Sequence, residues 1–115
     1  MPGARDDYLL RMIQQVAAAL RRLRERVNGG ALPDETMRDA GAAIGELLGP
    51  QHSLMELLDA KSASALAGDY ERLELWVQLI RLQAEAAHAA NDVARAEKLS
   101  ARANALEAAR PKPED

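Results

Sequence analysis

The stretch LLRMIQQVAAALRRLRERV, residues 9–27, decides the fold of this chain. Its aliphatic residues recur at spacings of 4, 3, 4, 3 and 4, and they are Leu9, Ile13, Val16, Leu20, Leu23 and Val27. This pattern is the a/d seam of a coiled coil, kept for nearly three heptads. Because a helix with such a seam must bury it, the pattern predicts a helical partner, either in the same chain or in a second copy.

The seam predicts a homodimer that is held together by the first helix, with these six residues in the contact. An antiparallel pair would place the cationic end of each helix beside Asp6 and Asp7 of its partner. In the alternative, the protein is a monomer and the helix folds back onto the body of its own chain. The charge distribution suits this docking as well, since residues 1–30 carry a net charge of +3 and the remaining residues −6.

The composition predicts an all-α protein. Leu and Ala dominate the 115 residues, β-branched residues are scarce, and Tyr8, Tyr70 and Trp76 are the only aromatic residues. There is no cysteine, which excludes a disulfide and a thiolate nucleophile and fits a cytoplasmic protein. No apolar stretch reaches the ~18 residues of a membrane span, and the first residues lack the apolar core of a signal peptide. We therefore expect no membrane partner.

We predict that residues 1–115 form a single domain, a compact bundle of four to five helices. Its parts are the heptad-patterned helix 6–28, a helical body 33–109 and a flexible tail 110–115. Asp6 or Asp7 is expected to cap the first helix. Gly29 is expected to end it by taking a left-handed conformation.

Turn and capping residues divide the helical body. A second helix is expected to begin at Pro33 and to end at Gly49-Pro50, followed by a short helix that carries Leu54, Leu57 and Leu58. We expect Ser62 to cap one further turn, Asp69 to cap a long helix over about 70–90, and Asp92 to cap the last helix, 92–109. The residues of this last helix that are expected to point inward are Val93, Ala96, Leu99, Ala103 and Leu106.

The long helix over about 70–90 is expected to be the centre of the fold. It has one narrow polar stripe, formed by Glu74, Gln78, Arg81, Glu85 and His88. Nearly all of its other residues are apolar, namely Leu73, Leu75, Trp76, Val77, Leu79, Ile80, Leu82, Ala84 and Ala87. A helix with so narrow a polar stripe packs against neighbours on two sides. We therefore expect Trp76 to be mostly buried.

The C-terminal part of the chain resembles one tetratricopeptide repeat. The reversal Asn91-Asp92-Val93-Ala94-Arg95-Ala96 resembles the turn between the two helices of that repeat. Gly68-Asp69-Tyr70-Glu71-Arg72 resembles the same turn, but it comes about 22 residues earlier, whereas repeats recur every ~34 residues. The resemblance therefore implies one repeat-like C-terminal helical hairpin and not an array.

The chain as a whole resembles a family of small bacterial proteins that is catalogued only as a domain of unknown function. The resemblance is carried by the opening Asp7-Tyr8-Leu9-Leu10-Arg11-Met12-Ile13 with Gln14-Gln15, a basic helix end, a leucine-rich middle and an alanine-rich hairpin. It covers roughly residues 6–109. It implies an all-helical bacterial protein and lends no activity, substrate or catalytic residue.

Residues that could carry chemistry are sparse. Glu85 and His88 have the Glu-x-x-His spacing of di-iron bundles, but such a site needs a second pair and further carboxylates, so we predict a solvated surface pair. His52 and Glu56 lie four residues apart, and we expect His52 to be exposed. The sequence has no nucleophile elbow and no phosphate-binding loop. We predict a protein that is not an enzyme and that has no catalytic residue, metal site or cofactor.

The basic run Arg21, Arg22, Arg24 and Arg26 supports the alternative function, a nucleic-acid-associated accessory protein. Against nucleic acid as a partner, Leu23 and Val27 interrupt the run as core positions, and no aromatic residue lies nearby to stack on bases. Pairing of these arginines with acids, or simple solvation, is favoured instead. The function that we predict is a helical protein–protein interaction module, homodimeric, with a further protein partner that the sequence does not identify.

Overall fold

The computed structural model describes residues 4–110, with side chains from residue 7 onward. Within this part of the chain the secondary structure is helical and contains no strand. Its elements in chain order are α1 (Ala4–Asn28), α2 (Pro33–Leu48), the 3₁₀ helix η1 (Gly49–Gln51), α3 (His52–Leu57), α4 (Ala60–Ala67), α5 (Tyr70–Ala89) and α6 (Val93–Ala109). The prediction of an all-α bundle is therefore confirmed.

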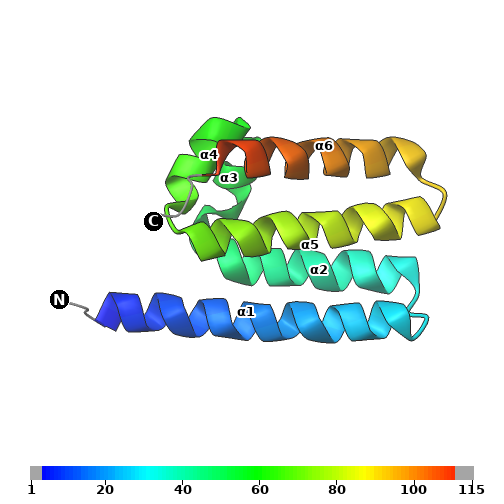
Figure 1. Ribbon diagram of the computed structural model, residues 1–115, viewed down its shortest axis with the longest axis horizontal. Coiled ribbons are helices and arrows are strands. Elements are labelled where there is room, and N and C mark those ends of the chain that lie inside the picture. Colours follow the sequence, from blue (N-terminus) through cyan, green and yellow to red (C-terminus); the bar gives the residue numbers. More distant parts are fainter. Residues whose placement is uncertain (1–3, 111–115) are drawn as a thin grey trace.

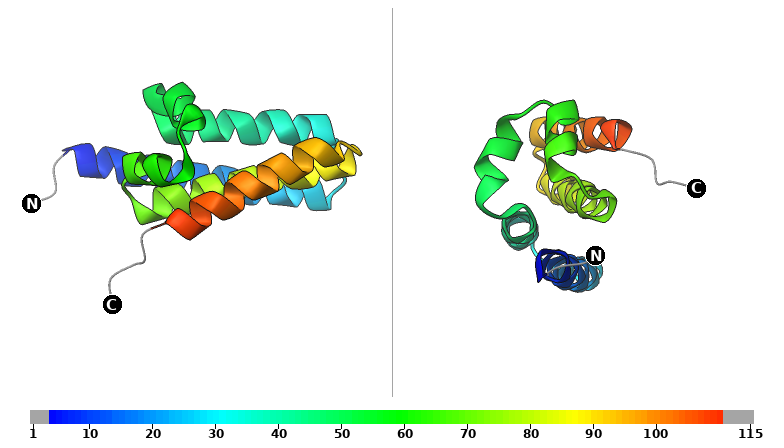
Figure 2. Two further views of the ribbon diagram at one scale, coloured as in Figure 1. Left: turned by 90° about the horizontal axis from the view of Figure 1, so that it is seen from above. Right: turned by 90° about the vertical axis from the view of Figure 1, so that its left-hand side faces the viewer.

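The long helices form two layers. Helices α1, α5 and α6 lie side by side in one layer (Figure 1), and α2 lies behind it against α1 and α5 (Figure 2). Helices α3 and α4 lie at one end of the bundle, where α4 packs against α6. The face of the first layer that points away from α2 carries no other described helix, and we call it the open face.

Helix α5 is the central helix, as its pattern predicts. It packs against α1, α2, α4 and α6, because its apolar residues surround most of its circumference. The residues predicted to be buried are buried, and they are Leu73, Leu75, Trp76, Val77, Leu79, Ile80, Leu82, Ala84 and Ala87. The side chain of Trp76 is only 1% exposed. The polar stripe forms the surface of α5, with Glu85 and His88 exposed and the other three residues half-buried.

The seam of α1 is buried within its own chain. Its four central residues belong to the core, and they are Ile13, Val16, Leu20 and Leu23. Leu9 and Val27 are half-buried and pack against that core. The arrangement in which α1 folds onto the body of its own chain therefore occurs here. The surface that the seam is predicted to offer to a second copy is occupied by α2 and α5.

The end of α1 differs from the prediction by one residue. Gly30, and not Gly29, takes the left-handed conformation, with a φ of +94°. The amide of Gly30 donates to the carbonyl of Val27 at 3.0 Å, and the amide of Ala31 donates to the carbonyl of Arg26 at 2.9 Å. These two bonds make a Schellman motif, which satisfies carbonyls at the helix end.

Two expected N-caps are wrong. Helix α1 begins at Ala4, so Asp6 and Asp7 lie inside its first turn and neither is its cap. At α4 the cap is Asp59, and not Ser62, because the Asp59 carboxylate accepts a hydrogen bond from the amide of Ser62 at 3.2 Å. Hydrogen bonding by Ser62 also lowers the pKa of the Asp59 carboxyl from its ordinary value.

The caps of the C-terminal hairpin are confirmed. The carboxylate of Asp69 accepts from the amide of Arg72 at 3.0 Å, and that of Asp92 accepts from the amide of Arg95 at 3.3 Å. Asn91 has a φ of +64° in the turn between α5 and α6. The structure therefore contains the predicted helical hairpin, while its likeness to a tetratricopeptide repeat stays a prediction.

Some aliphatic residues are more exposed than the sequence suggests. Val93 is predicted to point inward, but it is 51% exposed at the first residue of α6. In α3 the buried residue is Met55, whereas Leu54 and Leu57 are exposed. A helix of six residues presents one side to the core, and in α3 that side carries the methionine.

The prediction that Arg110 belongs to a flexible tail is wrong. Its guanidinium lies over the ring of Tyr70, 4.6 Å from the centroid, and forms an ion pair with Glu74. The hydroxyl of Ser64 donates to the carbonyl of Ala109 at 3.1 Å and holds the same end of α6. The folded body therefore extends to Arg110. The rest of the predicted tail, 111–115, lies outside the described residues.

Candidate interaction surface

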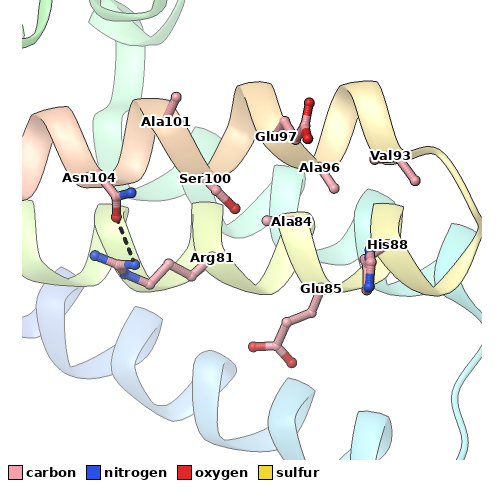
Figure 3. Close-up of a pocket in the computed structure, with 10 residues that line it drawn as sticks. All are labelled: Arg81, Ala84, Glu85, His88, Val93, Ala96, Glu97, Ser100, Ala101 and Asn104. Carbon is pink, nitrogen blue, oxygen red and sulfur yellow. Dashed lines mark hydrogen bonds between the residues drawn. The ribbon is translucent and has the colours of Figure 1, made fainter.

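A groove runs along the open face between α5 and α6 (Figure 3). Its volume is about 670 Å³. One wall is formed by α5 and the other by α6. Its lining residues are Arg81, Ala84, Glu85, His88, Val93, Ala96, Glu97, Ser100, Ala101 and Asn104. We call it the α5–α6 groove.

Small side chains form the floor of the α5–α6 groove. Ala84 and Ala96 are each 7% exposed and lie where the two helices meet. On the α6 wall, Ala101 and Val93 are exposed. Because alanine ends at its β-carbon, this floor allows the side-chain ridge of another helix to enter between α5 and α6.

The walls of the groove carry an acidic residue each. Glu85 on α5 and Glu97 on α6 are both exposed. The groove also contains the cation Arg81, but its guanidinium donates to Asn104 at 3.2 Å and to Glu107 at 2.5 Å. Since Glu107 balances the charge of Arg81 and Arg24 of α1 pairs with Glu85, the acid that remains on the groove walls is Glu97.

The two histidines differ in their surroundings. His88 and Glu85 are exposed on the α5 wall, as predicted, and Glu85 lies 3.7 Å from Arg24 of α1. His52 was expected to be exposed, but it is half-buried, because its ring lies against Gly45 and its Nε2 is 3.1 Å from a carboxylate oxygen of Glu56. In the described part of the chain, no three His, Cys, Asp or Glu side chains lie close enough together to hold a metal ion.

The basic run is divided between two sides of α1. Arg24 pairs with Glu85 of α5, and Arg26 pairs with Asp39 of α2 at 3.2 Å. Arg21 and Arg22 are exposed. The expected pairing with acids of the same chain is therefore confirmed for two of the four arginines. A helix that carries its cations on two sides presents less charge to any single phosphate backbone.

Arg72 has a structural role that the sequence did not reveal. Its half-buried guanidinium donates to the carbonyls of Leu47 and Leu48 at 3.0 and 3.1 Å, and to that of Ala67 at 3.5 Å. These are the last carbonyls of α2 and α4, which have no partner within their own helices. Burial lowers the pKa of Arg72, and the charge of Asp69 opposes this shift. One cation thus holds the ends of two helices.

We expect Arg72→Met to destabilise the fold by about 2–3 kcal/mol, because the carbonyls at these two helix ends lose a charged donor. Urea unfolding followed by circular dichroism measures this loss. Arg72→Lys should recover only a part of it, since an ammonium group cannot reproduce the fork of donors. Arg95→Met is the matched control at an exposed site. Equal unfolding midpoints for Arg72→Met and Arg95→Met would contradict the role assigned to Arg72.

The α5–α6 groove itself was not predicted, although the sequence holds a trace of it. Val93, Glu97, Ser100 and Asn104 recur at spacings of 4, 3 and 4 along α6, which places them on one side of that helix. By itself this spacing is that of an ordinary helix surface, because a groove also needs the neighbouring wall. Only the packing of α6 on α5 brings the two walls together.

None of the helices between residues 4 and 110 is both long enough and apolar enough to cross a membrane. No family model, no curated protein and no solved structure matches the chain. The resemblance to a bacterial domain of unknown function therefore stays a prediction.

Proposed function

We propose that this chain is a non-enzymatic interaction module that binds a helix of a partner protein in the α5–α6 groove. The observation that carries the proposal is the groove itself, which combines a floor of alanines with charged walls on an uncovered face of the bundle. Helix-binding grooves take up an amphipathic helix through side chains spaced three and four residues apart.

The position of the groove supports this function. Helices α1, α5 and α6 are covered by α2, α3 and α4 on one side, whereas their other side is the open face. The two acids, Glu85 and Glu97, flank the alanine floor. The partner helix that fits best therefore has small or aliphatic residues along one stripe and cations beside that stripe.

A photoreactive side chain placed in the groove tests the proposal. We would introduce it at Ala101 of the full-length chain, irradiate the chain in an extract of its source cells, and identify the adducts by mass spectrometry. Ala65 of α4, which is also an exposed alanine, is the matched control. We expect a specific protein adduct, attached through a helical segment, from Ala101 and not from Ala65. Adduct patterns that do not differ between the two positions would contradict the proposal.

The rival function is nucleic-acid binding through the basic end of α1, and the exposure of Arg21 and Arg22 is the observation that favours it. It requires a gel shift with DNA or RNA that weakens steeply as salt is raised and is lost in Arg21→Ala and Arg22→Ala. We expect no such shift, because Arg24 and Arg26 are already paired with acids.

A further inference from the structure

We propose that the occupant of the α5–α6 groove is the outer edge of α1 from a second copy of this chain, so that two copies exchange the same contact. The inference rests on the proposed function of the groove and adds the identity of the partner. The edge of α1 that enters the groove consists of Leu10, Gln14, Ala17, Arg21 and Arg24. We call it the α1 ridge.

The α1 ridge lies on the open face beside α5. Arg24 marks its position, since its guanidinium lies 3.7 Å from Glu85 of α5. The other four residues precede Arg24 at helical spacings of 3, 4, 3 and 4, and therefore form one continuous stripe with it. Leu10 is 51% exposed and Arg21 is also exposed. This stripe is distinct from the buried seam and provides α1 with a second side for packing.

The spacing of the ridge matches the spacing of the groove. On α5 the wall residues Arg81, Glu85 and His88 recur at 4 and 3, and on α6 Val93, Glu97, Ser100 and Asn104 recur at 4, 3 and 4. Side-chain rows with these spacings interdigitate when helices cross at a small angle, about 20°. The ridge can therefore run along the groove between α5 and α6.

The charges of the ridge and the groove are complementary. Arg21 and Arg24 are the cations of the ridge, and Glu85 and Glu97 are the acids of the groove walls, since Arg81 is neutralised by Glu107. Arg24 already pairs with Glu85 of its own copy, so the complementary charges that meet across the contact are those of Arg21 and Glu97. The ridge also has an acid nearby, Glu25, one turn beyond Arg21. The residue that follows Glu85 along the α5 wall of the groove is His88. Glu25 therefore lies opposite a histidine and not opposite a further carboxylate.

Symmetry brings Arg21 beside Glu97. The ion pair between Arg24 and Glu85 shows that these two residues lie at one level along the bundle. Glu97 is at this level too, because α5 and α6 run antiparallel from the turn at Asn91. A two-fold axis that runs parallel to the helices relates the two copies without a shift along the helix direction. Each residue of α1 therefore keeps its level along the bundle in the second copy. Arg24 of each copy then lies level with Glu97 of the other. Arg21, three residues or about 4.5 Å before it along the helix, reaches Glu97 through its long side chain, and the contact is made twice.

Light scattering on the full chain at low salt tests this arrangement. We expect wild type to have about twice the chain mass of 12.5 kDa. Arg21→Glu and Glu97→Arg should each raise the dimer dissociation constant by about tenfold or more, because each creates two like-charge contacts. The double variant with both changes should recover dimerisation. Arg22→Glu is the matched control, since Arg22 lies on the side of α1 that faces α2, and it should leave the dimer unchanged.

A monomeric wild type, equal effects of Arg21→Glu and Arg22→Glu, or a double variant that stays monomeric would each overturn the inference. The photoreactive side chain at Ala101 separates this failure from failure of the proposed function. An adduct that joins two chains at α1 supports both proposals. A specific adduct with a different protein, and none with α1, overturns the dimer and leaves the interaction module standing. No specific adduct overturns both.

Discussion

Leu20→Asp is expected to unfold the monomer. Leu20 is 6% exposed and belongs to the core that α1 forms with α2 and α5. A carboxylate placed there loses its hydration and gains no cation, so the cost exceeds about 4 kcal/mol. Small domains have total stabilities of roughly 5–15 kcal/mol. We therefore expect far-UV circular dichroism to show a large loss of helix.

Leu10→Asp is the matched control for this experiment. It introduces the same charge in place of the same residue on the same helix, at a position that is 51% exposed. We expect it to keep its helix content, whatever its effect on association. If Leu20→Asp instead gives a folded monomer, the seam is not part of the intrachain core. The same variant therefore separates burial of the seam within the chain from burial between two chains.

Trp76→Ala is expected to have the second-largest effect, a destabilisation of about 3–5 kcal/mol. Trp76 is the largest fully buried side chain and lies in the middle of the core. It also packs beneath Arg102 of α6, whose guanidinium is 5.6 Å from the ring centroid. Arg102 in turn donates to the carbonyl of Met55 in α3 at 2.9 Å. Removal of the indole therefore opens a cavity and releases the contact that connects α6 to α3.

Urea unfolding followed by circular dichroism measures this loss. Trp76→Phe keeps an aromatic face below Arg102 and a smaller cavity, so it should cost less than about half as much. In the wild type, Trp76 is the single tryptophan, and its emission should shift to longer wavelength on unfolding. An emission maximum of the folded protein at the value for exposed indole would contradict the burial of Trp76.

The ends of the helices show where local sequence rules succeed. Gly49, Asp69 and Asp92 act as the sequence predicts, because a left-handed glycine or a capping carboxylate works within a few residues of itself. The errors at Gly29 and Ser62 are shifts of one and three residues, to Gly30 and Asp59. Gly30 takes the conformation that was expected of Gly29, since either residue can adopt it and the last turn of α1 decides which one does.

The arginines show where local rules fail. Arg72 and Arg102 both donate to carbonyls on helices more than twenty residues away in the sequence. No spacing along the chain indicates such contacts, because the donor and the acceptor meet only after the helices have packed. The same holds for Arg110, which is held by Tyr70 and Glu74 and extends the folded body to the last described residue.

By itself, the sequence determined that this protein is all-helical, that α5 is central, and that α1 must bury its seam. These properties follow from periodicity and composition, which act along one helix at a time. The tertiary structure alone decided that the seam is buried against α2 and α5, and that α5 and α6 leave a groove between them. The sequence of one helix shows that its apolar stripe must be buried. The complementary surfaces of several helices determine which neighbour covers that stripe.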